Sequence, residues 1–259
     1  MNWAEALPAL RAQLDGVAVD MVDEVDSTNS ELLRRARAGD MPPTLLIAKA
    51  QTAAHGRMGR PWVAEADGAL TFSLALPLAP KDWSGLSLAI GLTLADALHP
   101  DIRIKWPNDL QIDGRKLAGI LIEIASGCAI IGVGINLRAP APDSTTAAAL
   151  QAHGITPAWL DELLPGTTAP TALLRVATPL VTTVRAFERT GFAPLQERFA
   201  ARDALAGLDI QLSDGSAGTA CGVAPDGALR VRTAQGIIDI RSSAVSVRAA
   251  ATDTPVNPC

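Results

Sequence analysis

The chain has 259 residues, of which 48% are hydrophobic and 19% charged, and its 22 Lys+Arg against 27 Asp+Glu give a net charge of −5 at pH 7. A chain of this length and composition can bury a large apolar core, which excludes a disordered protein. The acidic balance disfavours a general nucleic-acid binder, and no apolar run reaches the length of a membrane span.

The first half of the chain alternates predicted helices and strands. We expect strands at 17–25, 44–50 and 70–78 and helices at 2–14 and 86–98. Thr28 with Glu31 three residues later fits a capping box, which predicts a further helix that ends at Gly39. Residues 54–62 contain glycines and arginines without apolar periodicity and therefore indicate a loop.

The second half predicts a run of strands, two helices and a group of short strands. The first strands are expected at 103–106, 110–112, 116–124 and 129–137, and the helices at 171–187 and 194–204. Asp113-Gly114 is a hairpin turn signal, so residues 110–137 predict three sequential antiparallel strands. Short strands separated by Asp-Gly and Gly turns follow Gly207 and predict a small barrel. We therefore expect one domain at 1–207, a second at 208–248 and a tail at 249–259.

Cysteine usage and the N-terminal segment are informative about the cellular compartment of the protein. Cys128, Cys221 and Cys259 show no spacing typical of a disulfide framework or a zinc site. The three histidines are also too dispersed to predict a metal site. The first residues carry Glu5 and Arg11 instead of the apolar region of a signal peptide. We therefore expect a cytoplasmic protein.

The loop at 54–62 is the first of four segments that could carry chemistry, and neither a P-loop nor a dinucleotide fingerprint occurs. It interleaves cations with glycines: His55, Gly56, Arg57, Gly59 and Arg60. Glycines let backbone N–H groups approach an anion, and guanidinium groups bind phosphate or carboxylate with two hydrogen bonds. The alternative is a flexible surface loop.

The second and third segments each contain a lysine. Lys105-Trp106-Pro107-Asn108-Asp109 places a cation, an aromatic ring, an amide and a carboxylate at the end of a strand. On the next strand, Lys116 shares a predicted face with Ala118 and Ile120. An ammonium on such an apolar face needs an anionic partner, and a lysine at an exposed strand edge is the alternative.

The fourth segment is Gly132-Val133-Gly134-Ile135-Asn136, inside a predicted strand. Glycines weaken a strand, so they mark the close approach of a ligand or of another backbone, or else a bulge. Each of the four segments is a weak signal alone, whereas their order and spacing together are specific.

Together these segments resemble those of the biotin–protein ligases, also called biotin–[acetyl-CoA-carboxylase] ligases. The resemblance is carried by Asp26-Ser27-Thr28-Asn29, residues 51–62 (QTAAHGRMGRPW), 105–110 (KWPNDL), 116–121 (KLAGIL) and 132–137 (GVGINL). It covers residues 20–140 well, and from 170 to 248 only the pattern of elements agrees.

The resemblance implies both a fold and a reaction. The fold would be α+β and similar to class II aminoacyl-tRNA synthetases, with a mixed sheet backed by helices and a C-terminal SH3-like small β-barrel. The enzyme would use ATP and Mg²⁺ to convert biotin to biotinyl-5′-AMP and pyrophosphate. It would then transfer biotin to one lysine of a biotin carboxyl carrier protein, as a monomer or a homodimer.

The resemblance also implies the site residues. Lys116 and Arg57 would be catalytic. Biotin would be bound by Ser27, Thr28, Asn29, Gln51, His55, Gly56, Arg57, Lys116, Gly119 and Gly132. ATP would be bound by Arg57, Arg60, Trp62, Lys105, Trp106, Asn108, Asp109 and Asn136. No metal ligand is expected, and the loop at 54–62 would close over the adenylate because a mixed anhydride must be kept from water.

The chain departs from the family pattern at two places. The family loop commonly reads Gly-Arg-Gly-Arg-Arg-Gly-Arg, where residues 54–60 here read Ala-His-Gly-Arg-Met-Gly-Arg, so the role of His55 stays open. Some family members carry an N-terminal winged helix-turn-helix domain. Only 25 residues precede Asp26, so we expect no such domain and no DNA binding.

Two other functions are compatible with parts of the sequence. A lipoate ligase or octanoyl transferase resembles the same fold and also uses an active-site lysine, but the sequences at 105–109 and 59–62 disfavour it. A non-catalytic module, with the C-terminal barrel docking a protein or RNA, is disfavoured by the presence of both Arg57 and Lys116 in their motifs.

Overall fold

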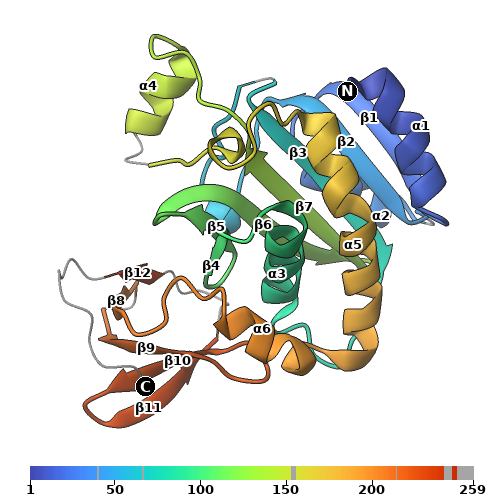
Figure 1. The fold of residues 1–259 in the computed structure, drawn as a ribbon. Helices are drawn as coiled ribbons and strands as arrows, with labels where there is room; N and C mark the ends of the chain where they lie inside the picture. The colour runs from blue at the N-terminus through green and yellow to red at the C-terminus, as the bar shows by residue number, and fades with distance from the viewer. Residues whose placement is uncertain (40, 66, 153–155, 214, 242–246, 250–259) are drawn as a thin grey trace.

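The computed structural model describes residues 1–39, 41–65, 67–152, 156–213, 215–241 and 247–249 (Figure 1). A seven-stranded sheet forms its centre, with strand order β1-β2-β3-β7-β6-β5-β4. Its strands are β1 (Ala18–Val25), β2 (Thr44–Gln51), β3 (Ala69–Pro77), β4 (Arg103–Lys105), β5 (Asp109–Ile112), β6 (Arg115–Ala125) and β7 (Cys128–Asn136). The β1–β2 pair is parallel and the other pairs are antiparallel. The mixed sheet of the predicted α+β fold is therefore confirmed, as are the three sequential antiparallel strands β5, β6 and β7.

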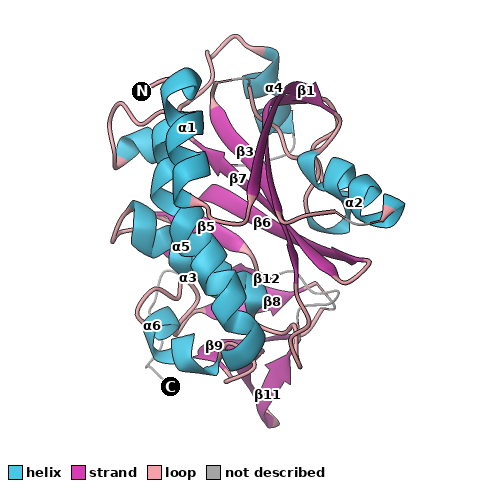
Figure 2. Ribbon diagram, turned by 90° about the vertical axis from the view of Figure 1, so that its right-hand side faces the viewer, coloured by secondary structure: helices cyan, strands magenta, loops and turns pink. Residues whose placement is uncertain are grey.

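Helices cover both faces of this sheet (Figure 2). The helices of the described ranges are α1 (Trp3–Gln13), α2 (Thr28–Ala38), α3 (Leu86–Leu98), α4 (Thr145–Ala152), α5 (Ala169–Thr190) and α6 (Gln196–Ala200), of which α4 projects away from the sheet in Figure 1. Figure 2 shows α1, α3 and α5 on one side of the sheet and α2 on the other. None of the helices in the described ranges combines the length and the apolarity that a membrane crossing requires.

The alternation of side chains along the strands explains why both faces of the sheet are covered. In β2, Leu45 and Ile47 belong to the main core, whereas Leu46 between them packs with the apolar residues of α2. In β7, Ile131 faces the main core and Ile130 faces α2. Because successive residues of a strand point to opposite faces, these near-continuous apolar runs require a layer on each side.

Two sequence-based expectations about helices were wrong in detail. The side chain that caps α2 belongs to Ser27, whose Oγ accepts from Ser30 N at 3.4 Å, and Thr28 is already the first helical residue. The helix expected at 194–204 is shorter, because a 3₁₀ turn at Ala193–Leu195 leads into α6 and the chain leaves the helix after residue 200.

A second, five-stranded sheet follows in the order β11-β10-β9-β8-β12. Its strands are β8 (Asp209–Leu212), β9 (Ala217–Val223), β10 (Leu229–Thr233), β11 (Gly236–Ile240) and β12 (Val247–Ala249). The expected group of short strands is therefore present. All but the first residue of the expected tail at 249–259 lies outside the described residues.

The second sheet is fastened to the first part of the chain by buried polar contacts. The indole Nε1 of Trp106 donates to Gly227 O at 3.1 Å, and Gln196 Nε2 donates to Val223 O at 2.7 Å. Gly227 has φ +81°, and a Cβ there would lie 2.6 Å from Gly85 Cα, so glycine alone fits this contact. Trp106 thereby joins the second sheet to the strand end that carries Lys105 and Asp109.

The segment after α6 also crosses the edge of the main sheet. Ile104 N donates to Arg202 O at 2.8 Å, and Ala204 N donates to Ile104 O at 2.9 Å. Between them, Asp203 Oδ1 accepts from Leu205 N at 2.9 Å, while Oδ2 is buried without a hydrogen-bond partner among the described residues. Burial raises the pKa of this carboxyl to about 6.

We expect Asp203→Asn to stabilise the fold near neutral pH. The folded pKa lies above the unfolded value, so the favourable contribution of the protonated acid is full below pH ~4 and is lost as pH rises through about 6. The neutral amide escapes this loss and should raise the free energy of unfolding at pH 7.5 by about 1–3 kcal/mol. Urea unfolding at pH 7.5 and 4.5 measures it, and a gain that does not shrink at pH 4.5 would contradict the assignment.

Candidate functional site

A cleft of about 1020 Å³, counted with its open mouth, lies on the face of the main sheet that also carries α2. The start of α2, the end of β2, the loops at 54–62 and 105–109, the middle of β6 and β7, and Val247 from the second sheet line it.

All but one of the residues predicted to bind biotin or ATP meet in this cleft. They are Ser27, Thr28, Asn29, Gln51, His55, Gly56, Arg57, Arg60, Trp62, Lys105, Trp106, Asn108, Asp109, Lys116, Gly119 and Gly132. Asn136 is the exception, because it lines a small neighbouring hollow and its Nδ2 donates to Lys116 O at 3.1 Å. It therefore supports the backbone of Lys116 from outside the cleft.

One end of the cleft is polar and nearly closed to solvent. Ser27 and Thr28 are only 4% and 3% exposed. Gln51 Oε1 accepts from Thr28 N at 2.7 Å, which orients the amide so that its NH₂ group lies on the other side. Ser27 Oγ accepts from Ser30 N, so its hydroxyl proton is available to a ligand.

Asn29 lies beneath this polar end and explains one of the strand glycines. Its Nδ2 donates to Glu123 Oε2 at 2.9 Å, and its Oδ1 lies 2.6 Å from Ser73 Oγ. A Cβ on Gly132 would lie 2.4 Å from Asn29 Oδ1. The glycine is therefore required by a protein side chain, whereas the sequence predicts a ligand, another backbone or a bulge at this place.

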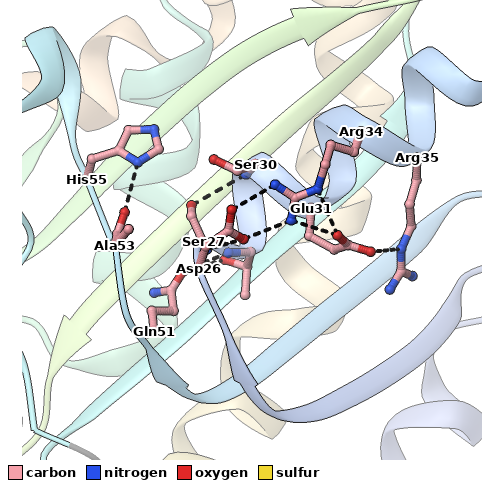
Figure 3. Close-up of polar contacts among 10 residues, drawn as sticks. Asp26, Ser27, Ser30, Glu31, Arg34, Arg35, Gln51, Ala53 and His55 are labelled. Carbon is pink, nitrogen blue, oxygen red and sulfur yellow. Dashed lines mark hydrogen bonds and ion pairs between the residues drawn. The ribbon is translucent and has the colours of Figure 1, made fainter.

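Ion pairs hold the first turns of α2 (Figure 3). Arg34 binds both carboxylate oxygens of Asp26 at 2.7 and 2.8 Å, and it also binds Glu31. The Arg34 hydrogen bonds, with help from the N–H of Ser27, lower the pKa of Asp26 to about 2. Glu31 pairs with Arg34 and Arg35 and does not bond the helix start, so the expected capping box does not form.

Short backbone hydrogen bonds shape the loop at 54–62. Gly56 N donates to Arg60 O at 2.7 Å and Trp62 N donates to Ala54 O at 2.9 Å, which makes the loop a compact hairpin around a 3₁₀ turn. His55 Nδ1 lies 3.3 Å from Ala53 O (Figure 3). The loop therefore has a defined backbone shape, although residues 58–61 are exposed at the surface.

The two arginines of this loop differ in burial. Arg57 is half-buried, and its Nη1 lies 3.5 Å from Asn108 Oδ1 in the facing loop. Desolvation lowers the pKa of its guanidinium, and the charge of Asp109 opposes that effect. Arg60 is exposed. Arg57 is thus the arginine that bridges the two loops.

Lys116 points into the cleft, and this corrects the face predicted for it. A register shift in the β5–β6 pairing lies beside it, so Gln111 pairs with Lys116 where regular alternation would pair it with Leu117. Such a bulge changes the direction of the side chain. Lys116 Nζ forms an ion pair with Asp109 Oδ1 at 2.8 Å, which supplies the anionic partner that we expected such an ammonium to need.

Trp62 lies on a platform made by two glycines. Gly119 and Gly134 pair across β6 and β7, and Cβ atoms on them would lie 3.3 and 2.6 Å from the indole ring. Lys116 Nζ lies over the Trp62 ring, 5.6 Å from its centroid and within cation–π range. As with Gly132, the approaching group at Gly134 is a protein side chain.

The charges of the cleft favour an anionic ligand. Its described lining holds four permanent cations, Arg57, Arg60, Lys105 and Lys116, and one carboxylate, Asp109. A neighbouring hydroxyl- and amide-rich end adds neutral donors and acceptors. The cleft can therefore hold an elongated ligand that has a hydrogen-bonding head and a carboxylate or phosphates at the other end.

Sequence reasoning missed Ser73 and Glu123, which support the polar end from below. Both read as ordinary polar residues within predicted strands. Their position under Asn29 depends on β-sheet register, since Ser73 and Leu121 both pair with Gly132 from opposite sides. The sequence alone does not fix that register.

Comparison with known proteins gives consistent relatives. The biotin/lipoate A/B protein ligase family matches residues 22–136. The chain is 34% identical over 231 residues to the biotin–[acetyl-CoA-carboxylase] ligase of Paracoccus denitrificans, covering 82% of this chain and 93% of that protein. It is 40% identical over 158 residues to the protein of the same name from Mycobacterium tuberculosis, covering 53% and 59%.

A solved structure agrees with these relatives. The biotin protein ligase from Aquifex aeolicus in complex with biotin and ATP aligns with a TM-score of 0.75 and 26% identity, over 90% of this chain and 99% of that chain. The chain spans about half the length of several curated relatives that it matches, namely 59%, 42% and 43% of three of them.

Proposed function

The chain belongs to the biotin/lipoate A/B protein ligase family, and we propose that it is a biotin–protein ligase. A carboxylate oxygen of biotin attacks the α-phosphorus of ATP, which releases pyrophosphate and forms biotinyl-5′-AMP. The ε-amine of one lysine on a biotin carboxyl carrier protein then attacks the acyl carbon, and AMP leaves.

The polar end of the cleft is the observation that carries this proposal. A cyclic urea has one carbonyl acceptor and two N–H donors. The hydroxyl proton of Ser27 and the NH₂ group of Gln51 can donate to the carbonyl, while Thr28 Oγ1 can accept from an N–H. A dithiolane ring or an alkyl end would leave these buried groups without partners, which disfavours lipoate and octanoate.

The cationic end suits the reacting groups. Arg57 and Lys116 would hold the biotin carboxylate and the α-phosphate, and Lys116 would stabilise the charge that develops as the new bond forms, which is supported by the position of both side chains in the cleft lining. Lys105, Asn108 and Arg60 would frame the remaining phosphates and the nucleoside. No protein nucleophile is needed, because the attacking groups belong to the substrates.

Mg²⁺ would enter with ATP. The described residues contain no group of three His, Cys, Asp or Glu side chains that could hold a metal ion. Mg²⁺ in nucleotide sites is held mainly by phosphates and water with one or two carboxylates. The one carboxylate of the cleft lining, Asp109, fits that donor set. Mg²⁺ would neutralise phosphate charge during adenylation.

Several finer features remain part of the proposal. We assign the small sheet to an SH3-like barrel forming a domain at 208–248, and the first domain, at 1–207, to the class II aminoacyl-tRNA synthetase-like type. We also propose a cytoplasmic location, a monomer or homodimer, no DNA binding and a carrier subunit of acetyl-CoA carboxylase as the partner.

An acylation assay tests the proposed function. The protein is incubated with ATP, Mg²⁺, a biotin carboxyl carrier fragment, and labelled biotin, lipoate or octanoate in parallel. We expect ATP-dependent labelling with biotin, preferred over the other acids by at least about 10³-fold, since a site built for hydrogen bonds rejects analogues that lack them. Transfer of lipoate or octanoate in place of biotin would assign the chain to the alternative activity.

A further inference from the structure

The backbone of Lys116 is hydrogen-bonded to a segment far along the chain, residues 156–162. Lys116 N donates to Thr156 O at 3.1 Å, and Ala158 N donates to Lys116 O at 2.8 Å. The two bonds form an isolated parallel bridge, which lies beside the register shift that directs the Lys116 side chain into the cleft. The segment therefore supports the irregular part of β6 that carries the ammonium.

One carboxylate joins the two sides of this bridge. Glu162 Oε1 accepts from Arg115 Nη1 at 3.0 Å and from Trp159 N at 2.8 Å, and Glu162 Oε2 accepts from Arg115 Nη2. Arg115 directly precedes Lys116, and Trp159 directly follows Ala158. The Glu162 side chain thus completes a ring of contacts around the hydrogen bond between Lys116 and Ala158.

The Arg115–Glu162 pair has a geometry that restrains this ring. The guanidinium binds both carboxylate oxygens, an arrangement that is stronger and more directional than a single hydrogen bond. The Arg115 hydrogen bonds lower the pKa of Glu162, so its carboxylate is ionised at neutral pH. Arg115 Nη1 also donates to Pro157 O at 3.3 Å, so the arginine binds the segment at two residues.

Other contacts hold the rest of the segment against the core. Ala158 and Leu160 are fully buried, and Asp161 N donates to Leu137 O at 3.0 Å. These contacts do not involve the Glu162 carboxylate, so they should keep the segment folded when that carboxylate is removed. The loss then affects the part of the segment that faces Lys116.

Resting on the proposed function, we propose that Glu162 is a positioning residue for Lys116 and acts through Arg115 and the bridge at 156–158. Glu162 does not line the cleft, so it does not touch a ligand there. A group that stabilises developing charge must be held within about 0.5 Å of its productive position, and a displacement of 1 Å can cost about 10²-fold in rate. Without the carboxylate, the backbone at Arg115 loses its restraint and the Lys116 ammonium moves from that position.

The first test is the rate of biotinyl-adenylate formation by Glu162→Ala, measured as pyrophosphate release in a single turnover at saturating biotin and ATP. We expect a rate about tenfold lower, which is part of the loss that a full 1 Å displacement causes. The KM for biotin should change by less than about twofold, because the polar end of the cleft is untouched.

Asp96→Ala is the matched control for loss of an ion-paired carboxylate. Asp96 binds Arg198 and Arg202 outside the cleft lining, and its side chain is 31% exposed, as is that of Glu162. Asp96→Ala should leave the adenylation rate unchanged. An unchanged rate in Glu162→Ala, or an equal loss in Asp96→Ala, would overturn the inference.

The second test asks whether Glu162 acts through Lys116. Lys116→Met lacks the ammonium, so the addition of Glu162→Ala to it should lower the adenylation rate by less than about twofold more. Damage that spreads through the fold would instead lower the rate by the same factor in both backgrounds. Equal factors in the two backgrounds would overturn the positioning role.

Failure of the two proposals is distinguishable. A wild-type protein that forms no biotinyl-adenylate contradicts the proposed function itself and removes the basis of the inference. Adenylate formation by the wild-type protein, with an unchanged rate in Glu162→Ala, contradicts only the positioning of Lys116 by Glu162.

Discussion

Lys116→Met is expected to lower the rate of biotinyl-adenylate formation by about 10²–10³-fold, the range seen when one preorganised charge-stabilising donor is removed. Methionine keeps most of the length and apolar volume of lysine and loses only the ammonium. Lys116 is partly exposed to the cleft, with 34% of its side chain accessible, so the fold should survive. The measurement is pyrophosphate release in a single turnover, with circular dichroism and thermal unfolding as checks of folding.

The ion pair with Asp109 requires a second variant. Removing Lys116 leaves the Asp109 carboxylate unpaired beside the proposed phosphate position, and its repulsion of the phosphates adds to the loss. The double variant Lys116→Met/Asp109→Asn is compared with Asp109→Asn alone, which lacks the same carboxylate, so the loss between these two variants measures the attraction that Lys116 supplies. We expect that loss to be at least about tenfold. Equal rates in the two variants would remove Lys116 from the mechanism.

Lys49 provides the matched control. It is one of four lysines in the chain and also forms an ion pair, with Asp23 at 2.6 Å, but it lies outside the cleft lining. Lys49→Met should leave adenylation unchanged. A loss like that of Lys116→Met would mean that the assay reports general damage to the protein.

The gathering of distant segments into one cleft is implied by the family resemblance that their motifs carry, and not by local patterns alone. Residues 51–62, 105–110 and 116–121 carry side chains whose chemistry is complementary to a carboxylate and phosphates, and turn residues place them at strand ends. Only the adjacency of β5, β6 and β7 followed from local signals, because Asp113-Gly114 and Ser126-Gly127 are turns between neighbouring strands. Turn signals of this kind depend only on neighbouring residues, so they can be recognised in the sequence.

What could not be predicted depends on register. The bulge that turns Lys116 into the cleft is a shift of one residue in pairing, and the alternation of a regular strand places the side chain on the wrong face. The sequence predicts a close approach at Gly132 and Gly134, yet only the folded sheet shows that Asn29 and Trp62 fill the space above them. Ser73 and Glu123 were missed for the same reason.

Arg57→Ala is the second substitution with a large expected effect, and it acts on retention of the intermediate. The half-buried guanidinium spans from the loop at 54–62 toward Asn108 in the facing loop. A hydrogen bond from a charged group to an anion contributes about 1.5–3 kcal/mol, so the variant should release biotinyl-5′-AMP about 10–100-fold faster. Preformed, labelled adenylate chased with unlabelled biotin gives its lifetime on the protein.

Faster release of biotinyl-5′-AMP should also change which proteins become biotinylated. Free biotinyl-5′-AMP acylates exposed amines without selection, so Arg57→Ala should biotinylate bystander proteins that the wild-type protein leaves unmodified. Arg60→Ala is the matched comparison, and because Arg60 is exposed on the same loop its adenylate lifetime should change less. If the Arg57 variant kept a wild-type adenylate lifetime and labelled the carrier alone, the result would show that other groups of the loop retain the adenylate. A shorter lifetime for Arg57→Ala than for Arg60→Ala would instead tie retention to the buried bridge between the two loops.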